Sequence, residues 1–127
     1  MLQVKTYIDK SSIHGIGLFA EEFIPKGTIV WIMSDLDMIL EQEEFDKLPI
    51  IAQDYIRKHG DWDIQMQKIT MSFDNDKFIN HSDKPNLRYN KNQTTESNKD
   101  ILKGEEITIN YFEFDEQASK KIFGITK

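Results

Sequence analysis

The stretch from Phe78 to Asn86 constrains the fold of this chain more than any other part of the sequence. It reads Phe-Ile-Asn-His-Ser-Asp-Lys-Pro-Asn, so two apolar residues run into a cluster of polar side chains that a proline and an asparagine close. Asparagine, serine, aspartate and proline favour turns through local hydrogen bonds and restricted backbones. The stretch therefore predicts a strand that ends in a tight polar loop, although an ordinary turn needs only one or two such residues.

Two further motifs flank this stretch. Residues 14–20 read His-Gly-Ile-Gly-Leu-Phe-Ala, and residues 104–111 read Gly-Glu-Glu-Ile-Thr-Ile-Asn-Tyr. Two glycines one residue apart permit positive φ and a close approach of the backbone to another group. The first motif is not a dinucleotide-binding fingerprint, because a third glycine and a following helix are missing. Any one of the three motifs is also typical of an ordinary turn or strand end.

Composition excludes several classes of protein. The chain has 127 residues, which predicts a single domain over residues 1–127. It contains no cysteine, which excludes disulfides and cysteine-ligated zinc and fits an intracellular, cytoplasmic protein, or a nuclear or chromatin-associated one if the source is eukaryotic or viral. No apolar run approaches the ~20 residues of a membrane span, and no apolar leader is recognisable. The net charge of −6 argues against direct binding of nucleic acid.

The negative charge is concentrated in one central segment. Between Asp35 and Asp63 the chain carries nine acidic and three basic side chains, whereas the remaining residues carry 13 of each. The spacing of apolar residues predicts two helices here, over residues 41–48 and 49–59, with Gly60 as the stop signal. The acids have two interpretations that stay open: a solvated helix face, or a surface that attracts a basic peptide.

The rest of the sequence predicts a mostly β fold. Short segments rich in β-branched and aromatic residues alternate with glycine and proline turns. Residues 90–99 are polar throughout and predict a mobile hairpin loop, whereas residues 116–127 have weak helical periodicity. Strands are expected over residues 4–8, 17–20, 28–33, 64–73, 87–89 and 107–111.

Taken together and in this order, the three motifs resemble the signatures of SET-domain lysine methyltransferases, over roughly Val4 to Asp115. The resemblance implies a mostly β fold of β-clip type, with several short curved sheets and a C-terminal pseudoknot. It also implies an acidic helical insert at about residues 35–63 and a C-terminal tail at residues 114–127. In length, and in lacking a cysteine-rich zinc cluster, the chain is similar to the small viral and bacterial SET proteins.

The resemblance implies an enzyme that transfers a methyl group directly from S-adenosylmethionine to a lysine ε-amine in a narrow channel, without a metal. Tyr111 matches the catalytic tyrosine of the family. Asn80 and His81 match the residues that bind the adenosine part of the cofactor. The turn that holds its methionine part matches Gly15, Ile16 and Gly17.

Two of the residues expected to form the walls of the lysine channel differ from those usual in the family. Met33 stands where many members have a tyrosine, with Trp31 on the same strand face, and Ile109 stands where many have phenylalanine or tyrosine. The number of methyl groups added is therefore left open. The aromatic that replaces the zinc cluster as a closing wall is expected to be Phe114, with Phe112 and Phe123 as alternatives.

The implied partner is a basic protein or peptide, such as a histone tail, and self-association through the tail is an open alternative. Two other functions also stay open. One is a catalytically inactive SET fold that binds a peptide or cofactor without turnover. The other is a metal-dependent hydrolase, because carboxylates and a histidine can hold Mn²⁺ or Zn²⁺. Its candidate ligands are Asp74, Asp76, His81 and Asp83.

Overall fold

The computed structural model describes residues 1–123, in which ten short strands form three small sheets. The first sheet has the order β1-β2-β10-β7, with β1 at Thr6–Lys10, β2 at Ile16–Ala20, β10 at Glu106–Ile109 and β7 at Asn80–His81. The second has the order β3-β9-β8, with β3 at Ile29–Ile32, β9 at Thr94–Ser97 and β8 at Leu87–Tyr89. The third has the order β4-β6-β5, with β4 at Met38–Leu40, β6 at Lys68–Met71 and β5 at Asp61–Asp63. The predicted mostly β architecture is confirmed.

Strand β10 brings the three sequence motifs together. It pairs with β2 in the antiparallel direction, where Ile107 faces Leu18, and with β7 in the parallel direction, where Thr108 faces Asn80. The buried side chain of Asn86 adds a clamp: its Nδ2 donates to the carbonyl of Glu106 at 2.8 Å, and its Oδ1 accepts from the amide of Thr108 at 2.8 Å. Leu18 and Ile107, which are 89 positions apart, are thereby fixed in one sheet. The predicted pseudoknot stays a prediction.

Three α-helices and two 3-10 helices complete the described residues. They are α1 (Gln42–Asp46), α2 (Ile50–His59), η1 (Asn75–Phe78), η2 (Tyr111–Glu113) and α3 (Ala118–Phe123). Helix α2 begins after Pro49 and ends at Gly60, as the sequence predicts. Buried Gln53 ties α1 to α2, because its Nε2 donates to the carbonyls of Phe45 at 3.2 Å and Leu48 at 3.1 Å.

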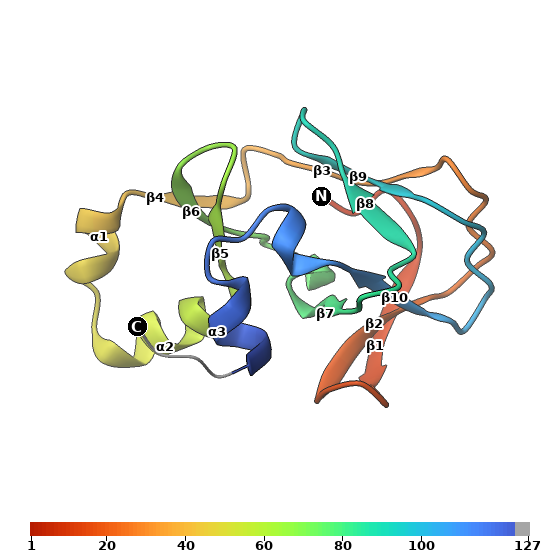
Figure 1. The fold of residues 1–127 in the computed structure, drawn as a ribbon, viewed down its shortest axis with the longest axis horizontal. Coiled ribbons are helices and arrows are strands. Elements are labelled where there is room, and N and C mark those ends of the chain that lie inside the picture. The colour runs from red at the N-terminus through yellow and green to blue at the C-terminus, as the bar shows by residue number, and fades with distance from the viewer. Residues whose placement is uncertain (124–127) are drawn as a thin grey trace.

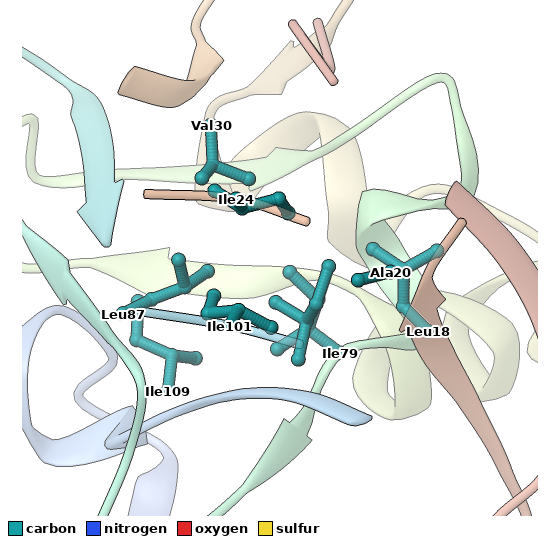
Figure 2. Close-up of a cluster of buried hydrophobic side chains, with 9 residues drawn as sticks. Leu18, Ala20, Ile24, Val30, Ile79, Leu87, Ile101 and Ile109 are labelled. Atoms are coloured by element: carbon teal, nitrogen blue, oxygen red, sulfur yellow. The ribbon is translucent and has the colours of Figure 1, made fainter. Parts of the chain in front are cut away.

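The protein has two hydrophobic cores of unequal size. The larger core lies between the first two sheets, and Figure 2 shows its side chains gathered from both of them. Its buried members are Leu18, Ala20, Ile24, Val30, Ile79, Leu87, Ile101, Ile107 and Ile109. The smaller core joins α1, α2 and the third sheet, and its buried members are Phe45, Ile56 and Ile69. Figure 1 shows α1, α2 and the third sheet on one side of the molecule and the first two sheets on the other.

Three expectations about local structure are wrong. The segment of about residues 35–63 is not helical throughout. It begins with β4 and ends with β5, and both strands pair with β6. The strand expected over residues 64–73 begins only at Lys68, because residues 64–67 form a turn in which Gln67 has a φ of 57°. The expected loop over residues 90–99 contains β9, which pairs with both β3 and β8. Within residues 1–123, no helix has the length and apolar character to cross a membrane.

Candidate functional site

A cavity of about 790 Å³ lies between the two sides of the molecule. One wall is the turn from His14 to Ile16 together with Asn80, so it comes from the first and second sequence motifs. The opposite wall comes from α1, α2 and β5, and includes Phe45, Arg57 and Trp62. Tyr111 and Lys121 also line it. A cavity of this size and mixed lining suits an organic ligand of several hundred daltons.

The two glycines of the first motif serve different purposes. Gly15 has a φ of +47°, which disfavours other residues, and a Cβ there would meet nothing within 4 Å. A Cβ at Gly17 would lie only 2.4 Å from Oε2 of Glu106 and 3.2 Å from Nδ2 of Asn80. The close approach predicted for this motif therefore occurs at Gly17, against side chains of the same protein. Gly15 keeps the face of the turn open.

Glu106 organises the floor beneath this turn, and sequence analysis did not single it out. Its carboxylate accepts from the hydroxyl of Ser11 at 2.7 Å and from Nδ2 of Asn80 at 2.9 Å. Nδ2 of Asn80 also donates to the carbonyl of His14 at 2.9 Å. Asn80 is 7% exposed, so its amide holds the glycine turn in place while the residue borders the cavity. The signal for Glu106 was its position in the Gly-Glu-Glu of the third motif.

Tyr111 is held by its backbone, its ring and its hydroxyl. The hydroxyl donates to the carbonyl of Ile79 at 2.6 Å, and the amide donates to Nδ1 of His81 at 3.1 Å. Because Nδ1 accepts, neutral His81 carries its proton on Nε2, which donates to Asp83 at 2.9 Å. His81 thus lies behind Tyr111, and it is not among the described residues that line the large cavity.

Burial raises the pKa of Tyr111 to about 12. Nearby Lys121 works against this shift, whereas the carboxylates of Asp61 and Asp115 add to it. The phenol therefore stays neutral at physiological pH. It can orient a polar group through its oxygen, but it does not supply a phenolate base.

A second cavity, of about 60 Å³, adjoins the first. The residues that line both are Lys58, His59, Lys77, Ile79, Tyr111 and Lys121. The three residues expected to wall a lysine channel, Met33, Ile109 and Phe114, all line this small cavity. Trp31 lines it as well. The Phe114 ring lies 6.1 Å from that of Tyr111 and 5.3 Å from that of Tyr89.

The alternative closing aromatics lie elsewhere. Phe112 is 46% exposed, and its ring contacts that of His81 at 5.9 Å. It is not among the described residues that line either cavity. The side chain of Phe123 lies outside the described part of the structure. Of the three candidates, Phe114 is therefore the one whose described side chain borders the small cavity.

The small cavity is also acidic, which sequence analysis did not anticipate. Burial raises the pKa of Asp76 to about 7, although a hydrogen bond from Ser72 at 2.8 Å opposes this. Burial raises the pKa of Asp61 as well, against the opposing charge of Lys121. The acids that line the cavity are Asp37, Asp61, Asp63 and Asp76. No group of three or more metal-ligating side chains gathers anywhere in residues 1–123.

Comparison with known proteins identifies a family. The family model of the SET domain matches residues 15–112 of the chain. A search of curated proteins gave no match. Among solved structures, a Plasmodium falciparum protein provisionally assigned as a histone methyltransferase is similar, with a TM-score of 0.62 and 24% identity over 87% of this chain and 95% of its own.

Two other similar structures belong to larger chains. The Neurospora SET domain protein DIM-5, a histone lysine methyltransferase, has a TM-score of 0.58 and 22% identity, over 87% of this chain and 53% of its own. A humanized mutant of the Chaetomium thermophilum Polycomb Repressive Complex 2, bound to the inhibitor GSK126, has a TM-score of 0.61 and 21% identity, over 92% of this chain and 16% of its own. At these identities the likeness establishes the fold.

Proposed function

This chain belongs to the SET-domain family, and on that premise we propose that it is a protein-lysine N-methyltransferase that uses S-adenosylmethionine. One observation carries the proposal. The large cavity and the small one meet at Tyr111, the residue that matches the family's catalytic tyrosine. Direct methyl transfer requires a donor site and an acceptor site that open onto each other, and this arrangement supplies both.

The large cavity suits the proposed cofactor in its size and in the chemistry of its lining. The open face of the Gly15 turn presents backbone groups, while Phe45 and Trp62 supply apolar surface. Arg57 borders the same space and offers a positive charge for a carboxylate. When bound, S-adenosylmethionine supplies a methyl group attached to a positively charged sulfur. The backbone of residues 14–16, Asn80 and the α2 wall would hold it.

The small cavity fits the acceptor. A lysine amine has a reference pKa of about 10.4 and must be neutral to act as a nucleophile. The apolar and aromatic side chains of Met33, Ile109 and Phe114 remove water, which favours the neutral form, whereas ionised carboxylates of the same cavity favour the charged form, so the apolar walls must outweigh them at the reacting position. Because the hydroxyl of Tyr111 already donates to the carbonyl of Ile79, its oxygen is oriented to accept a hydrogen bond from the amine. The proton released by the amine passes to solvent.

The proposed substrate is a basic protein or peptide, and histone tails are the first candidates. Two observations support this. The whole net charge of −6 resides between Asp35 and Asp63, on the side of the molecule that forms the outer cavity wall. In addition, the Neurospora protein of similar fold is described as a histone lysine methyltransferase.

The test combines cofactor binding with methyl transfer. Calorimetric titration with S-adenosylmethionine is followed by transfer of tritiated methyl onto a panel of histones and lysate proteins. Tyr111→Phe should leave cofactor affinity unchanged and reduce transfer by about 10²-fold or more, the usual cost of losing one oriented polar group in a reaction site. Tyr55→Phe is the control: Tyr55 lies on α2 and is 43% exposed, and the variant should keep full activity.

Two results would contradict the proposal. One is the absence of cofactor binding to the unaltered protein. The other is full methyl transfer by Tyr111→Phe. Cofactor binding without transfer to any protein on the panel would instead favour the inactive binding module.

A further inference from the structure

Lys121 on α3 places its ammonium group inside the molecule. The Nζ atom donates to the carbonyl of Gly60 at 2.5 Å and to Oδ1 of Asp61 at 3.0 Å, and it forms an ion pair with Oδ2 of Asp115 at 2.5 Å. The same atom lies 5.4 Å from the centroid of the Tyr111 ring. An ammonium has three hydrogens to donate, and three oxygens surround this one. We call these four partners the ammonium cage.

The cage is largely removed from water. The side chain of Lys121 is 13% exposed, that of Asp115 is fully buried, and that of Asp61 is 31% exposed. Asp115 is itself fixed, because its Oδ1 accepts from the amides of Trp62 at 3.0 Å and Gln117 at 2.9 Å. A buried cation with this set of partners is the arrangement that a binding site for a primary ammonium ion requires.

One side of the cage borders the place where the two cavities join. Lys121 and Tyr111 line both cavities and Asp61 lines the small one, whereas Gly60 and Asp115 lie behind them and are not among the described residues that line either cavity. In the proposed function this junction is the place where the acceptor amine meets the methyl donor. A second ammonium group cannot enter the cage beside that of Lys121, because like charges a few ångströms apart repel and the oxygens of the cage are already engaged. A substrate lysine therefore competes with Lys121.

We propose that the ammonium cage is the recognition site for the side-chain ammonium of the substrate lysine, and that Lys121 occupies it as an internal plug until substrate displaces it. This inference rests on the proposed methyltransferase function for the identity of the competing ligand. The cage itself is defined by Gly60, Asp61, Asp115 and Tyr111.

Lys121 is a plug and not a methyl acceptor. The carboxylates of Asp61 and Asp115 outweigh burial and raise the pKa of Lys121, so an amine held in the cage keeps its proton and has no free electron pair to attack a methyl group. A substrate lysine that has displaced Lys121 must therefore leave the cage and lose its proton before it accepts a methyl group beside Tyr111. Helix α3 that carries Lys121 spans only Ala118–Phe123, and a helix this short is marginal by itself.

The first experiment tests the cage without using activity. Lys121→Ala removes the propylammonium end of the side chain and should lower Tm, because two carboxylates lose their partner. Adding n-propylammonium chloride should restore Tm in a saturable way in this variant and leave the unaltered protein unchanged. The matched probe n-propanol has the same chain without the charge and should restore nothing. Equal effects of n-propylammonium on both proteins would overturn the cage as a binding site.

The second experiment tests the plug in the enzyme. Removing a plug that is in place about 90% of the time should lower KM for a lysine peptide about tenfold. Lys121→Met is the main variant, and Lys121→Arg keeps the charge and should keep the high KM. Arg88→Met is the control. It also replaces a paired cation, because Arg88 on β8 lies 2.8 Å from the carboxylate of Glu96, but Arg88 is not among the described residues that line either cavity.

The outcomes separate the two proposals. An unchanged or raised KM in Lys121→Met overturns the plug, and so does a methyl group found on Lys121 by tandem mass spectrometry. If Lys121→Met does not fold, Lys121→Arg provides the test, and a low KM in that variant overturns the plug. If the unaltered protein neither binds S-adenosylmethionine nor transfers methyl, the proposed function fails. The n-propylammonium result still decides whether the cage binds an ammonium ion.

Discussion

The β half of the molecule (residues 1–33 and 72–113) and the helical half (residues 34–71) differ in how they are held together. The β half contains nine fully buried apolar residues in one core and all three sequence motifs. The helical half contains three, and no motif, yet it forms the opposite wall of the large cavity. We infer that most of the stability resides in the β half, whereas the helical half is the weaker part that shapes the binding space. Figure 1 shows the two halves side by side.

The largest effect is expected in the core of the β half. Ile107 is 0% exposed and lies on β10, which holds the three motifs together. Ile107→Ala should reduce the free energy of unfolding by about 4 kcal/mol, because the lost methylenes leave a cavity that packed sheets cannot close. Urea denaturation measures this. Its matched control is Ile8→Ala at 42% exposure on β1, which should cost far less.

The same substitution in the helical half should cost less and act locally. Ile69 is 2% exposed on β6, and Ile69→Ala should cost about 2–3 kcal/mol, because a small core can relax around the gap. Amide hydrogen exchange should show faster opening of residues 34–71 with the β half protected. Cofactor affinity should fall with it. Ile39→Ala, at 44% exposure on the neighbouring strand, is the control. A uniform loss of protection over both halves would contradict the comparison.

Next in size is the link between α1 and α2. Gln53 is 8% exposed, and its amide satisfies carbonyls at the end of α1, including that of Leu48. Gln53→Ala should cost about 1–2 kcal/mol, because buried carbonyls lose their donor. Circular dichroism on heating measures the loss of helix. Gln65→Ala, at an exposed position, should leave Tm unchanged. An equal decrease of Tm in both variants would contradict the role assigned to Gln53.

The smallest effect depends on pH and belongs to the small cavity. Burial raises the pKa of Asp76 from 3.8 to about 7 in the folded state. Between these values the folded protein binds more protons than the unfolded chain, so stability should fall as pH rises from about 4 to about 7. Asp76→Asn should flatten this dependence and make the protein more stable than the unaltered one at pH 8, where the buried carboxylate would be ionised. Equal Tm of the two proteins at pH 8 would contradict the assignment.

Local signals explain what the sequence predicts well. Pro49 and Gly60 bound α2, and the apolar alternation of the motif strands places Leu18 and Ile107 in the core. Strand β9 was missed because its residues are polar. Its side chains are nevertheless buried, at 7% exposure for Thr94 and 1% for Ser97, and the hydroxyl of Ser97 donates to the carbonyl of Pro25 at 2.7 Å. Tertiary partners of this kind cannot be read from a short polar run.

In the candidate site too, residues with local sequence signals could be predicted, and those set by tertiary contacts could not. The glycine turn, Asn80, Tyr111, Ile109 and Phe114 could be placed because they lie in or near motifs, and Met33 could be placed because it ends the apolar run of residues 28–33. The ammonium cage could not, since Lys121 is 60 residues from Asp61 in the sequence. The role of Asn80 in holding the carbonyl of His14 was also hidden, because its amide could equally have been free for a ligand. The assignments of these residues to cofactor, channel and catalysis stay predictions.

The two tryptophans offer an optical consequence of the paired cavities. The chain has two tryptophans. Trp31 lines the small cavity, and Trp62 lines the large one, where its Nε1 donates to Gln42 at 3.1 Å. Replacing either with phenylalanine leaves a single emitter beside one cavity. Changes in emission wavelength or quenching would then report filling of each compartment separately, in real time and without any label.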